Sequence, residues 1–167
     1  KQLSLQCNLT MSNVVETAWA VTLAQYSFAD DVVFGKIISG RDIDNIPNIE
    51  NVLGVFINTI PIRTQYNEET TIKELLENVR QQDLDSIEHG HCPLVDIQNL
   101  TEQKGRLIQT LFVYENYYVD SNYSSLSQNN LINFEYVDGR EQTNYPITAV
   151  AKTDENNNRI VISVLYN

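Results

Sequence analysis

The segment from Leu107 to Tyr114 is an almost unbroken apolar run, and it constrains the fold of this chain more than any other feature of the sequence. Such a run is typical of a central strand that is covered on both faces. With 167 residues, the chain has the length of one ordinary domain and can bury a normal core. We therefore expect one domain built around a sheet.

A first helix is predicted over residues 12–27. Its apolar residues wrap far around the circumference, which is typical of a helix that is buried on more than one side. Either Ser12 or Thr10 can cap its start. Two aspartates then interrupt the chain before an apolar strand at residues 32–38, and this succession of helix and strand favours an α/β arrangement.

A second helix is predicted over residues 71–88. It begins with a capping box, in which the side chains of Thr71 and Glu74 satisfy each other's helix-start amides. The sequence from His89 to Pro93 is expected to end it, and residues 94–98 can form a short helical turn. Its apolar stripe consists of Ile72, Leu75, Leu76, Val79, Leu84 and Ile87.

The remaining apolar segments have the pattern of strands. Pro61 places the first of them at a sheet edge or at a bend, and Phe56, Asn58, Ile60 and Ile62 fall on one of its faces. Polar residues mark loops at 39–53 and 120–130 and a hairpin turn at 154–158. The further strands are expected at 54–63, 131–137, 145–152 and 159–166. The predicted fold class is α/β, a mixed sheet with packed helices.

Charge and cysteine content narrow the class of protein. The chain has 11 basic and 22 acidic residues, a net charge of −11, which disfavours nucleic acids and anionic membranes as partners. No apolar run approaches the roughly 20 residues that span a bilayer, and no secretory signal is visible. Cys7 and Cys92 are interpreted as reduced thiols of a cytosolic protein, although one disulfide between them stays open.

The residue types of familiar active sites are present without the spacing they need. His89 and His91 are two residues apart, which does not place them on one face, so a zinc site is disfavoured. A nucleophilic pair of Cys92 and His91 is disfavoured because Pro93 restricts the preceding residue to an extended conformation. From composition and spacing alone, the chain is an α/β domain without a visible active site or metal centre.

Two polar residues have a structural and a functional interpretation. Arg41 follows Ser39-Gly40 at the end of an apolar strand, where its guanidinium can point into a cleft beside a carboxylate. A surface pair with Asp42 or Asp44 is the favoured alternative, because such pairs are common. Asn58 lies on an apolar strand face and is either a buried structural amide or a residue that lines a cleft.

Five segments together resemble the second half of nonribosomal peptide synthetase condensation domains. They occur in the order and at about the spacing of that family and cover nearly the whole chain, and the stretch Gly54-x-Phe56-Ile57-Asn58-Thr59 is the most specific. Asn48 stands where a Gly is common in the family. The five are 18–41, 49–61, His91-Cys92-Pro93-Leu94 with Ile97-Gln98, 112–117, and Asn144-Tyr145-Pro146-Ile147.

The resemblance implies a chloramphenicol-acetyltransferase-like fold of two lobes, with residues 1–167 as the C-terminal lobe. It implies amide-bond formation between aminoacyl or peptidyl thioesters carried on 4′-phosphopantetheine, and residues 53–59 resemble the peptide-bond-forming type. The family's catalytic motif, H-H-x-x-x-D-G, belongs to the first lobe and does not occur here. This lobe is therefore expected to hold no catalytic residue and no cofactor and to be inactive alone.

The resemblance also assigns roles and partners. It implies that Arg41, with Ser39 and Gly40, lies at the lobe boundary and pairs with the Asp of the catalytic motif, a supporting role. The expected partners are the N-terminal lobe and the peptidyl carrier and adenylation domains of a cytoplasmic synthetase. Two alternatives stay open: a stand-alone carrier-binding or scaffold module, and an unrelated acyltransferase, which would need an activated catalytic His. The residues expected to line the tunnel between the lobes are Asn58, Thr59 and Phe56.

Overall fold

The computed structural model describes residues 4, 8–41, 47–115, 142–154 and 157–166. The predicted strand at 131–137, the loop at 120–130 and Cys7 therefore lie outside the described residues. No helix in the described ranges has the length and hydropathy needed to cross a bilayer. The helices are α2 (Met11–Ser27), α3 (Ile72–Ile87) and α4 (Leu94–Asn99), with short 3-10 turns η1 (Ile49–Asn51) and η2 (Lys104–Arg106). The strands are β1 (Asp31–Ile38), β2 (Asn58–Gln65), β3 (Thr110–Glu115), β4 (Ile147–Asp154) and β5 (Arg159–Tyr166).

The five strands form one mixed sheet in the order β2-β1-β3-β4-β5. The central strands β1, β3 and β4 run parallel, and the outer strands β2 and β5 are antiparallel to their neighbours. This arrangement confirms the α/β class, the central place of β3, the edge position inferred from Pro61, and the hairpin between β4 and β5. The strand β3 begins at Thr110, three residues later than predicted.

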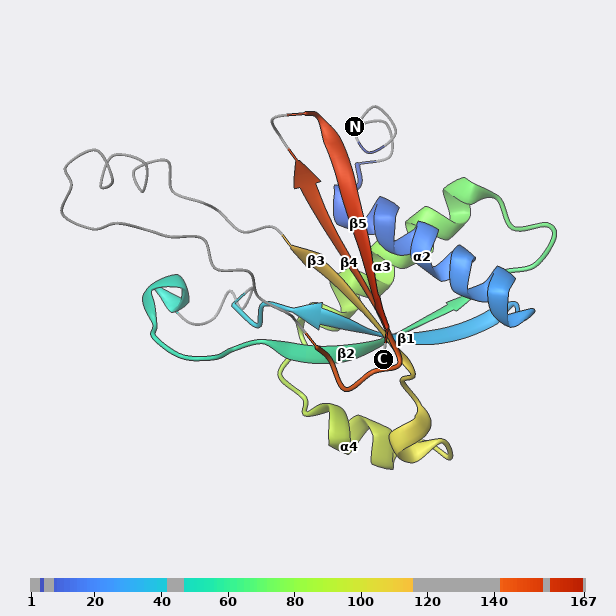
Figure 1. The fold of residues 1–167 in the computed structure, drawn as a ribbon. Coiled ribbons are helices and arrows are strands. Elements are labelled where there is room, and N and C mark those ends of the chain that lie inside the picture. Colours follow the sequence, from blue (N-terminus) through green and yellow to red (C-terminus); the bar gives the residue numbers. More distant parts are fainter. Residues whose placement is uncertain (1–3, 5–7, 42–46, 116–141, 155–156, 167) are drawn as a thin grey trace.

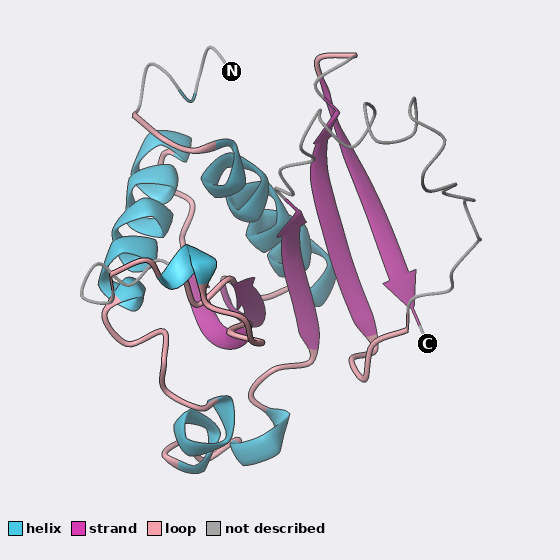
Figure 2. Ribbon diagram, turned by 90° about the vertical axis from the view of Figure 1, so that its left-hand side faces the viewer, coloured by secondary structure: helices cyan, strands magenta, loops and turns pink. Residues whose placement is uncertain are grey.

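Helix α2 packs on both the sheet and α3, as its apolar circumference predicts (Figure 2). Its cap is Thr10, whose hydroxyl accepts from the amide of Asn13 while the Asn13 side chain accepts from the amide of Thr10. The prediction misjudged which residues face inward, because Glu16 is fully buried whereas Ala18 is exposed. The inward face of α2 therefore carries an ionisable side chain, Glu16, that the mostly apolar composition of the helix does not predict.

Helix α3 begins at the predicted capping box of Thr71 and Glu74. Its buried stripe is shorter than predicted, because Ile72 lies exposed in the first turn and Leu84 is also exposed. The residue one helical turn after the buried Val79 is Asp83, which bonds to Lys36 of β1. That carboxylate takes the inward position that the apolar pattern assigned to Leu84.

The core lies between the two helices and the part of the sheet that they cover. Phe34 of β1 and Phe112 of β3 meet edge to face, with ring centroids 6.4 Å apart. Strand pairing places Val164 and Ile162 of β5 on the same face as Ala149 and Ala151 of β4, but the buried core cluster includes neither Val164 nor Ile162. An apolar strip on this face is consequently open to solvent: Ile147, Ile162, Val164 and Tyr166 are exposed. The cluster of buried core residues is Val15, Ala20, Phe34, Ile60, Ile62, Phe112, Ala149 and Ala151.

Candidate functional site

The side chain of Arg41, just beyond the end of β1, is held by backbone carbonyls of a segment that follows in the sequence. Its Nη1 donates to the carbonyl oxygens of Ile49 at 2.6 Å and Val52 at 2.9 Å, and its Nη2 donates to that of Gly54 at 3.0 Å. The guanidinium carbon also lies 4.4 Å from the ring centroid of Phe56. Arg41 therefore binds residues 49–56 of its own chain at four points.

The backbone near Arg41 depends on residues that tolerate left-handed conformations. Gly40 has a φ of +65°, and a Cβ there would lie 2.0 Å from the carbonyl oxygen of Phe56. Asn48, directly before η1, has a φ of 58°. A positive φ is strained for most side chains but is tolerated by Gly and Asn, which gives a physical reason for an Asn at position 48.

Residues 52–57 lie between η1 and β2 and extend beyond the sheet (Figure 1). We call them the projecting segment. The sequence predicted a strand from Gly54, but β2 begins at Asn58, which pairs with Ile38. Because β1 ends at Ile38, none of the described strands pairs with the residues that precede Asn58. The exposed fractions of Leu53, Val55 and Ile57 are 99%, 91% and 61%.

Asn58 connects the start of β2 to the turn after α3. Its Nδ2 donates to the carbonyl oxygens of Gly90 and Cys92, both at 2.8 Å, and its Oδ1 accepts from the amide of Thr59. Asn58 is half-buried, and its amide nitrogen donates twice within the chain, which is compatible with the structural interpretation. Its place in a tunnel wall stays a prediction.

The turn between α3 and α4 has the role that the sequence predicted. α3 ends at Ile87, α4 begins at Leu94, and the intervening backbone is tied to β2 by Asn58. His89 and His91 are exposed, and Cys92 is a half-buried free thiol. Within the part of the chain that the structure describes, no group of three or more His, Cys, Asp or Glu residues is placed to hold a metal ion.

The structure brings the six expected site residues to one corner of the molecule. The pairing of Ile38 with Asn58 sets the end of β1 beside the start of β2, so Ser39, Gly40 and Arg41 are neighbours of Phe56, Asn58 and Thr59. The alternative partners of Arg41, Asp42 and Asp44, lie outside the described residues. In the structure, Arg41 contacts carbonyl oxygens and an aromatic ring. These contacts hold residues 49–56 at this corner, next to the exposed apolar side chains of the projecting segment. The expected pairing of Arg41 with an Asp from another lobe stays a prediction.

A second polar cluster, which the sequence did not predict, lies between α2, β1 and α3. The Nζ of Lys36 donates to Glu16 Oε2 and Asp83 Oδ1, each at 2.5 Å, and Asn13 Nδ2 donates to Asp83 Oδ2 at 2.6 Å. Burial raises the pKa of Glu16 to about 7, against the attraction of Lys36 and with the repulsion of Asp83 adding to it. We call these four residues the buried ion cluster.

The sequence did contain a signal for this cluster. Glu16 interrupts an apolar helix and Lys36 interrupts an apolar strand, and Lys36 is two residues from the buried Phe34, hence on the same face. A buried charge requires a partner of opposite sign. The two carboxylates that pair with Lys36, those of Glu16 and Asp83, come from different helices. The pattern of a single segment therefore does not identify them as its partners.

Comparison with known proteins gives a match over the whole chain. Residues 1–167 match the condensation domain family. Tyrocidine synthase 3 of Brevibacillus parabrevis is 38% identical over 166 residues, which are 99% of this chain and 2% of that protein. Bacitracin synthase 3 of Bacillus licheniformis is 37% identical over 150 residues, which are 89% of this chain and 2% of that protein.

Solved structures share the fold. A four-domain nonribosomal peptide synthetase bound to AMP and glycine superposes with a TM-score of 0.75 at 18% identity, over 99% of this chain and 14% of that chain. A condensation domain from the monacolin K polyketide synthase gives a TM-score of 0.73 at 19% identity, over 98% of this chain and 38% of that one. The chain therefore spans a small part of its curated relatives and little more than a third of that domain. The match along its whole length shows that the chain belongs to the condensation domain family.

Proposed function

We propose that the chain is the C-terminal lobe of a peptide-bond-forming condensation domain with a chloramphenicol-acetyltransferase-like fold. The observation that carries the proposal is the coverage: 98% of this chain superposes on 38% of a condensation domain structure. The sequence has no pair of adjacent histidines, so the proton-handling group belongs to the first lobe. The lobe alone is inactive and provides one wall of the active site.

The proposed reaction joins two substrates that carrier domains hold as thioesters on 4′-phosphopantetheine. The amine of the acceptor attacks the thioester carbonyl of the donor. A C–N bond forms, the C–S bond breaks, and the donor's phosphopantetheine thiol is released. The matching relatives are named as synthases of tyrocidine and bacitracin, which supports a role in secondary-metabolite assembly. The proposed neighbours are peptidyl carrier and adenylation domains in the cytoplasm.

The corner around Arg41 is the proposed boundary with the first lobe. Arg41, Ser39 and Gly40 form its edge, and Asn58, Thr59 and Phe56 belong to the wall of the substrate tunnel. The projecting segment supports the proposal that this corner faces the first lobe, because its residues Leu53, Val55 and Ile57 are apolar yet exposed. Exposed apolar side chains that cluster on one segment mark interaction sites. The occupant to which we commit is the first lobe, because this chain covers only 38% of a condensation domain structure and the rest of that domain needs a surface to dock on.

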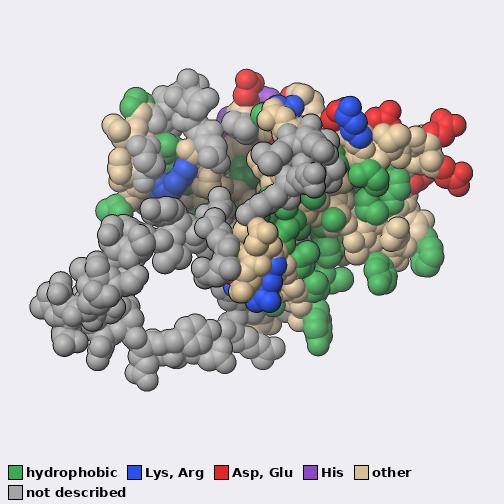
Figure 3. Space-filling model, turned by 90° about the horizontal axis from the view of Figure 1, so that it is seen from above, with side chains coloured by type: hydrophobic (Ala, Val, Ile, Leu, Met, Phe, Trp, Pro, Cys, Tyr) green, Lys and Arg blue, Asp and Glu red, His purple; other side chains and the backbone are tan. Residues whose placement is uncertain are grey.

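Surface composition supports the same proposal. Figure 3 shows hydrophobic side chains gathered on the surface, with acidic side chains gathered at one end. The uncovered strip on β4 and β5 adds Ile147, Ile162, Val164 and Tyr166 to the exposed apolar residues. A chain that leaves this much apolar surface uncovered is expected to bury part of it against further protein.

The test compares the chain alone, the first lobe alone and the two mixed, using donor and acceptor thioesters on carrier proteins. We expect amide product only when both lobes are present, and none when the histidines of the first lobe are replaced by alanine. Amide formation by the chain alone would contradict the proposal. Tight binding of phosphopantetheinylated carrier protein by the chain, without activity in the mixture, would favour the stand-alone carrier-binding module instead.

A further inference from the structure

We propose that Arg41 is a positioning residue, whose guanidinium folds residues 49–56 so that Leu53, Val55 and Ile57 are presented together to the first lobe. The inference rests on the proposed function for the identity of the partner. The fold of the segment itself is independent of that identity, because it follows from contacts within the chain. The proposal differs from an ion pair across the lobe boundary, which the family resemblance implies for the same residue.

The first step is the number and spacing of the carbonyls that Arg41 binds. Ile49, Val52 and Gly54 are separated by three and two residues, and one planar group reaches all three of their oxygens. A guanidinium presents five N–H donors in a fixed fork, whereas an ammonium is a compact point charge on a flexible stem. Arginine therefore bridges three carbonyls in a way that lysine does not reproduce.

The second step is the packing of Phe56 and Gly40. The ring of Phe56 lies against the guanidinium, and its carbonyl lies so close to Gly40 that a side chain there would collide with it. Phe56 is half-buried by these contacts, while Val55 and Ile57 on either side of it are exposed. In an extended chain successive side chains point to opposite sides. Holding Phe56 inward thus turns Val55 and Ile57 outward.

The third step is energetic. None of the described strands pairs with residues 53–57, so the contacts of Arg41 with Gly54 and Phe56 contribute to ordering this segment, beside the backbone bonds of η1. Ordering backbone costs roughly 1–2 kcal/mol per residue. A segment that is ordered before it meets its partner avoids that cost at the moment of binding. Loss of the clamp should weaken the association of the lobes while leaving the core between the helices and the sheet intact.

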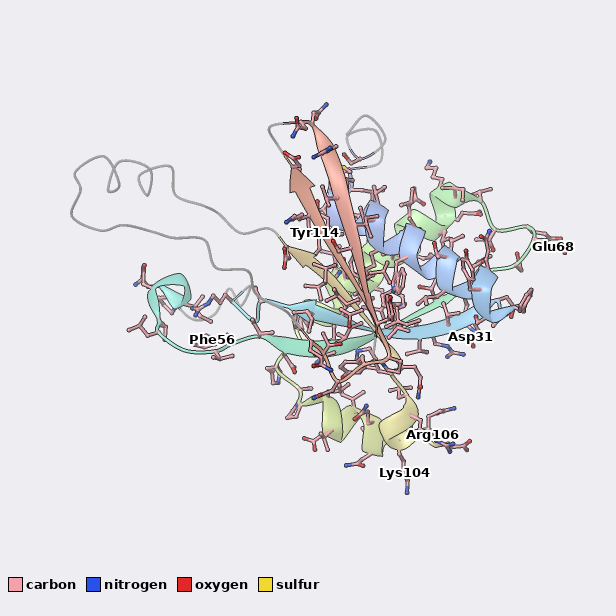
Figure 4. The ribbon with its side chains drawn as sticks, in the orientation of Figure 1. Asp31, Phe56, Glu68, Lys104, Arg106 and Tyr114 are labelled. Carbon is pink, nitrogen blue, oxygen red and sulfur yellow. The ribbon has the colours of Figure 1, made fainter. Side chains whose placement is uncertain are left out.

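The experiment uses the chain, residues 1–167, as wild type and as Arg41→Lys, Arg41→Gln and Arg63→Lys. Arg63 is the matched control, because its guanidinium makes two exposed hydrogen bonds to Asp31, at the other end of β1. Figure 4 shows Phe56 on the projecting segment and Asp31 far from it. Backbone ¹⁵N order parameters of residues 49–56 are measured by NMR, and affinity for the separately expressed first lobe is measured by calorimetry.

We expect order parameters of roughly 0.85 in residues 49–56 of the wild type and values below about 0.6 in both Arg41 variants. Affinity for the first lobe should fall at least tenfold in both variants, with β1 and β3 as rigid as before. Arg63→Lys should change neither quantity. The order parameters are measured on the chain alone, so a loss of order in Arg41→Lys reports on the carbonyl clamp and not on an ion pair with another lobe.

Three results would overturn the inference or its basis, and each is recognisable. A segment that stays rigid in Arg41→Lys removes the clamp. A mobile segment with unchanged affinity removes the positioning role. A wild-type chain that does not bind the first lobe removes the proposed function together with the docking step, whereas the order parameters still report separately on the contacts of Arg41.

Discussion

Two cations that lie five residues apart along β1 and its end are held in opposite ways. Lys36 is buried beneath α2 and α3 and is bound by the carboxylates of Glu16 and Asp83. Arg41 lies at the partly exposed corner beyond the strand and is bound by neutral carbonyls and a ring. A buried charge needs a partner of opposite sign. A partly exposed charge such as that of Arg41 does not, and its guanidinium can instead bind neutral carbonyl oxygens. The first cation joins elements of the core, and the second shapes a surface.

Removing the buried cation should have the largest effect. We expect Lys36→Met to lower the free energy of unfolding at pH 8, where Glu16 is ionised, by about 3–5 kcal/mol, because the carboxylates of Glu16 and Asp83 would then face each other without a counter-charge. Urea denaturation measures the change. Lys73→Met is the control, since Lys73 makes an exposed pair with Glu77 one turn along α3 and its loss should change little. Similar effects from both variants would show that the cluster does not stabilise the core.

A pH series should sharpen the same contrast. Burial raises the pKa of Glu16 from 4.5 to about 7, so the folded chain keeps a proton that the unfolded chain releases. This stabilisation is complete below about pH 4.5 and is lost as the pH rises through 7. Between pH 5 and 8 the wild type should lose on the order of 2 kcal/mol more than Glu16→Gln, measured by urea unfolding. Equal losses in both proteins would argue that Glu16 is ionised throughout.

At the exposed corner, a backbone change should have a smaller and more local effect. We expect Gly40→Ala to destabilise the chain by about 1–3 kcal/mol, because the residue has a positive φ and the added Cβ meets the carbonyl of Phe56. Gly105→Ala is a suitable control, since a Cβ at Gly105 has no neighbour within 4 Å. Thermal unfolding and amide exchange compare the two. A neutral Gly40→Ala would mean that residues 49–56 are not held against Gly40.

The smallest effect on stability is expected on the outward side of the projecting segment. Leu53→Ser with Val55→Ser removes exposed apolar side chains that pack on nothing, so the free energy of unfolding should hardly change. Affinity for the first lobe should nevertheless fall, as calorimetry would show. Ile72→Ser, which alters an exposed apolar residue on α3, should leave that affinity unchanged. A loss of stability without a loss of affinity would reverse the roles assigned to the two regions.

Much of the architecture was predictable from local pattern. The capping box of Thr71 and Glu74, the central apolar strand, the edge proline and the final hairpin are each encoded within a few neighbouring residues. The start of β2 was misplaced because the alternation continues through Gly54 to Ile57, whereas the partner strand ends at Ile38. The position at which a strand begins depends on where its neighbouring strand ends. The sequence of one segment alone does not carry that information.

The candidate corner was identified through resemblance, and its contacts came from the structure. Sequence analysis predicted carboxylate partners for Arg41, and these stay a prediction because Asp42 and Asp44 lie outside the described residues. The acceptors that the structure adds are carbonyl oxygens of Ile49, Val52 and Gly54. Every residue has a backbone carbonyl, so the identity of the side chains does not indicate which carbonyl oxygens accept hydrogen bonds from Arg41. The buried ion cluster joins residues 16, 36 and 83, and their meeting depends on how α2 and α3 cross the sheet.

By itself, the sequence determined the order of helices and strands, the place of the chain in a peptide-synthetase family, and the lack of a histidine pair in it. Periodicity, capping and turn residues act over a few positions, so a linear reading captures them. Only the tertiary structure decided which charges are buried together and which backbone oxygens surround Arg41. Those contacts depend on distances between segments remote in the sequence, and packing alone fixes such distances.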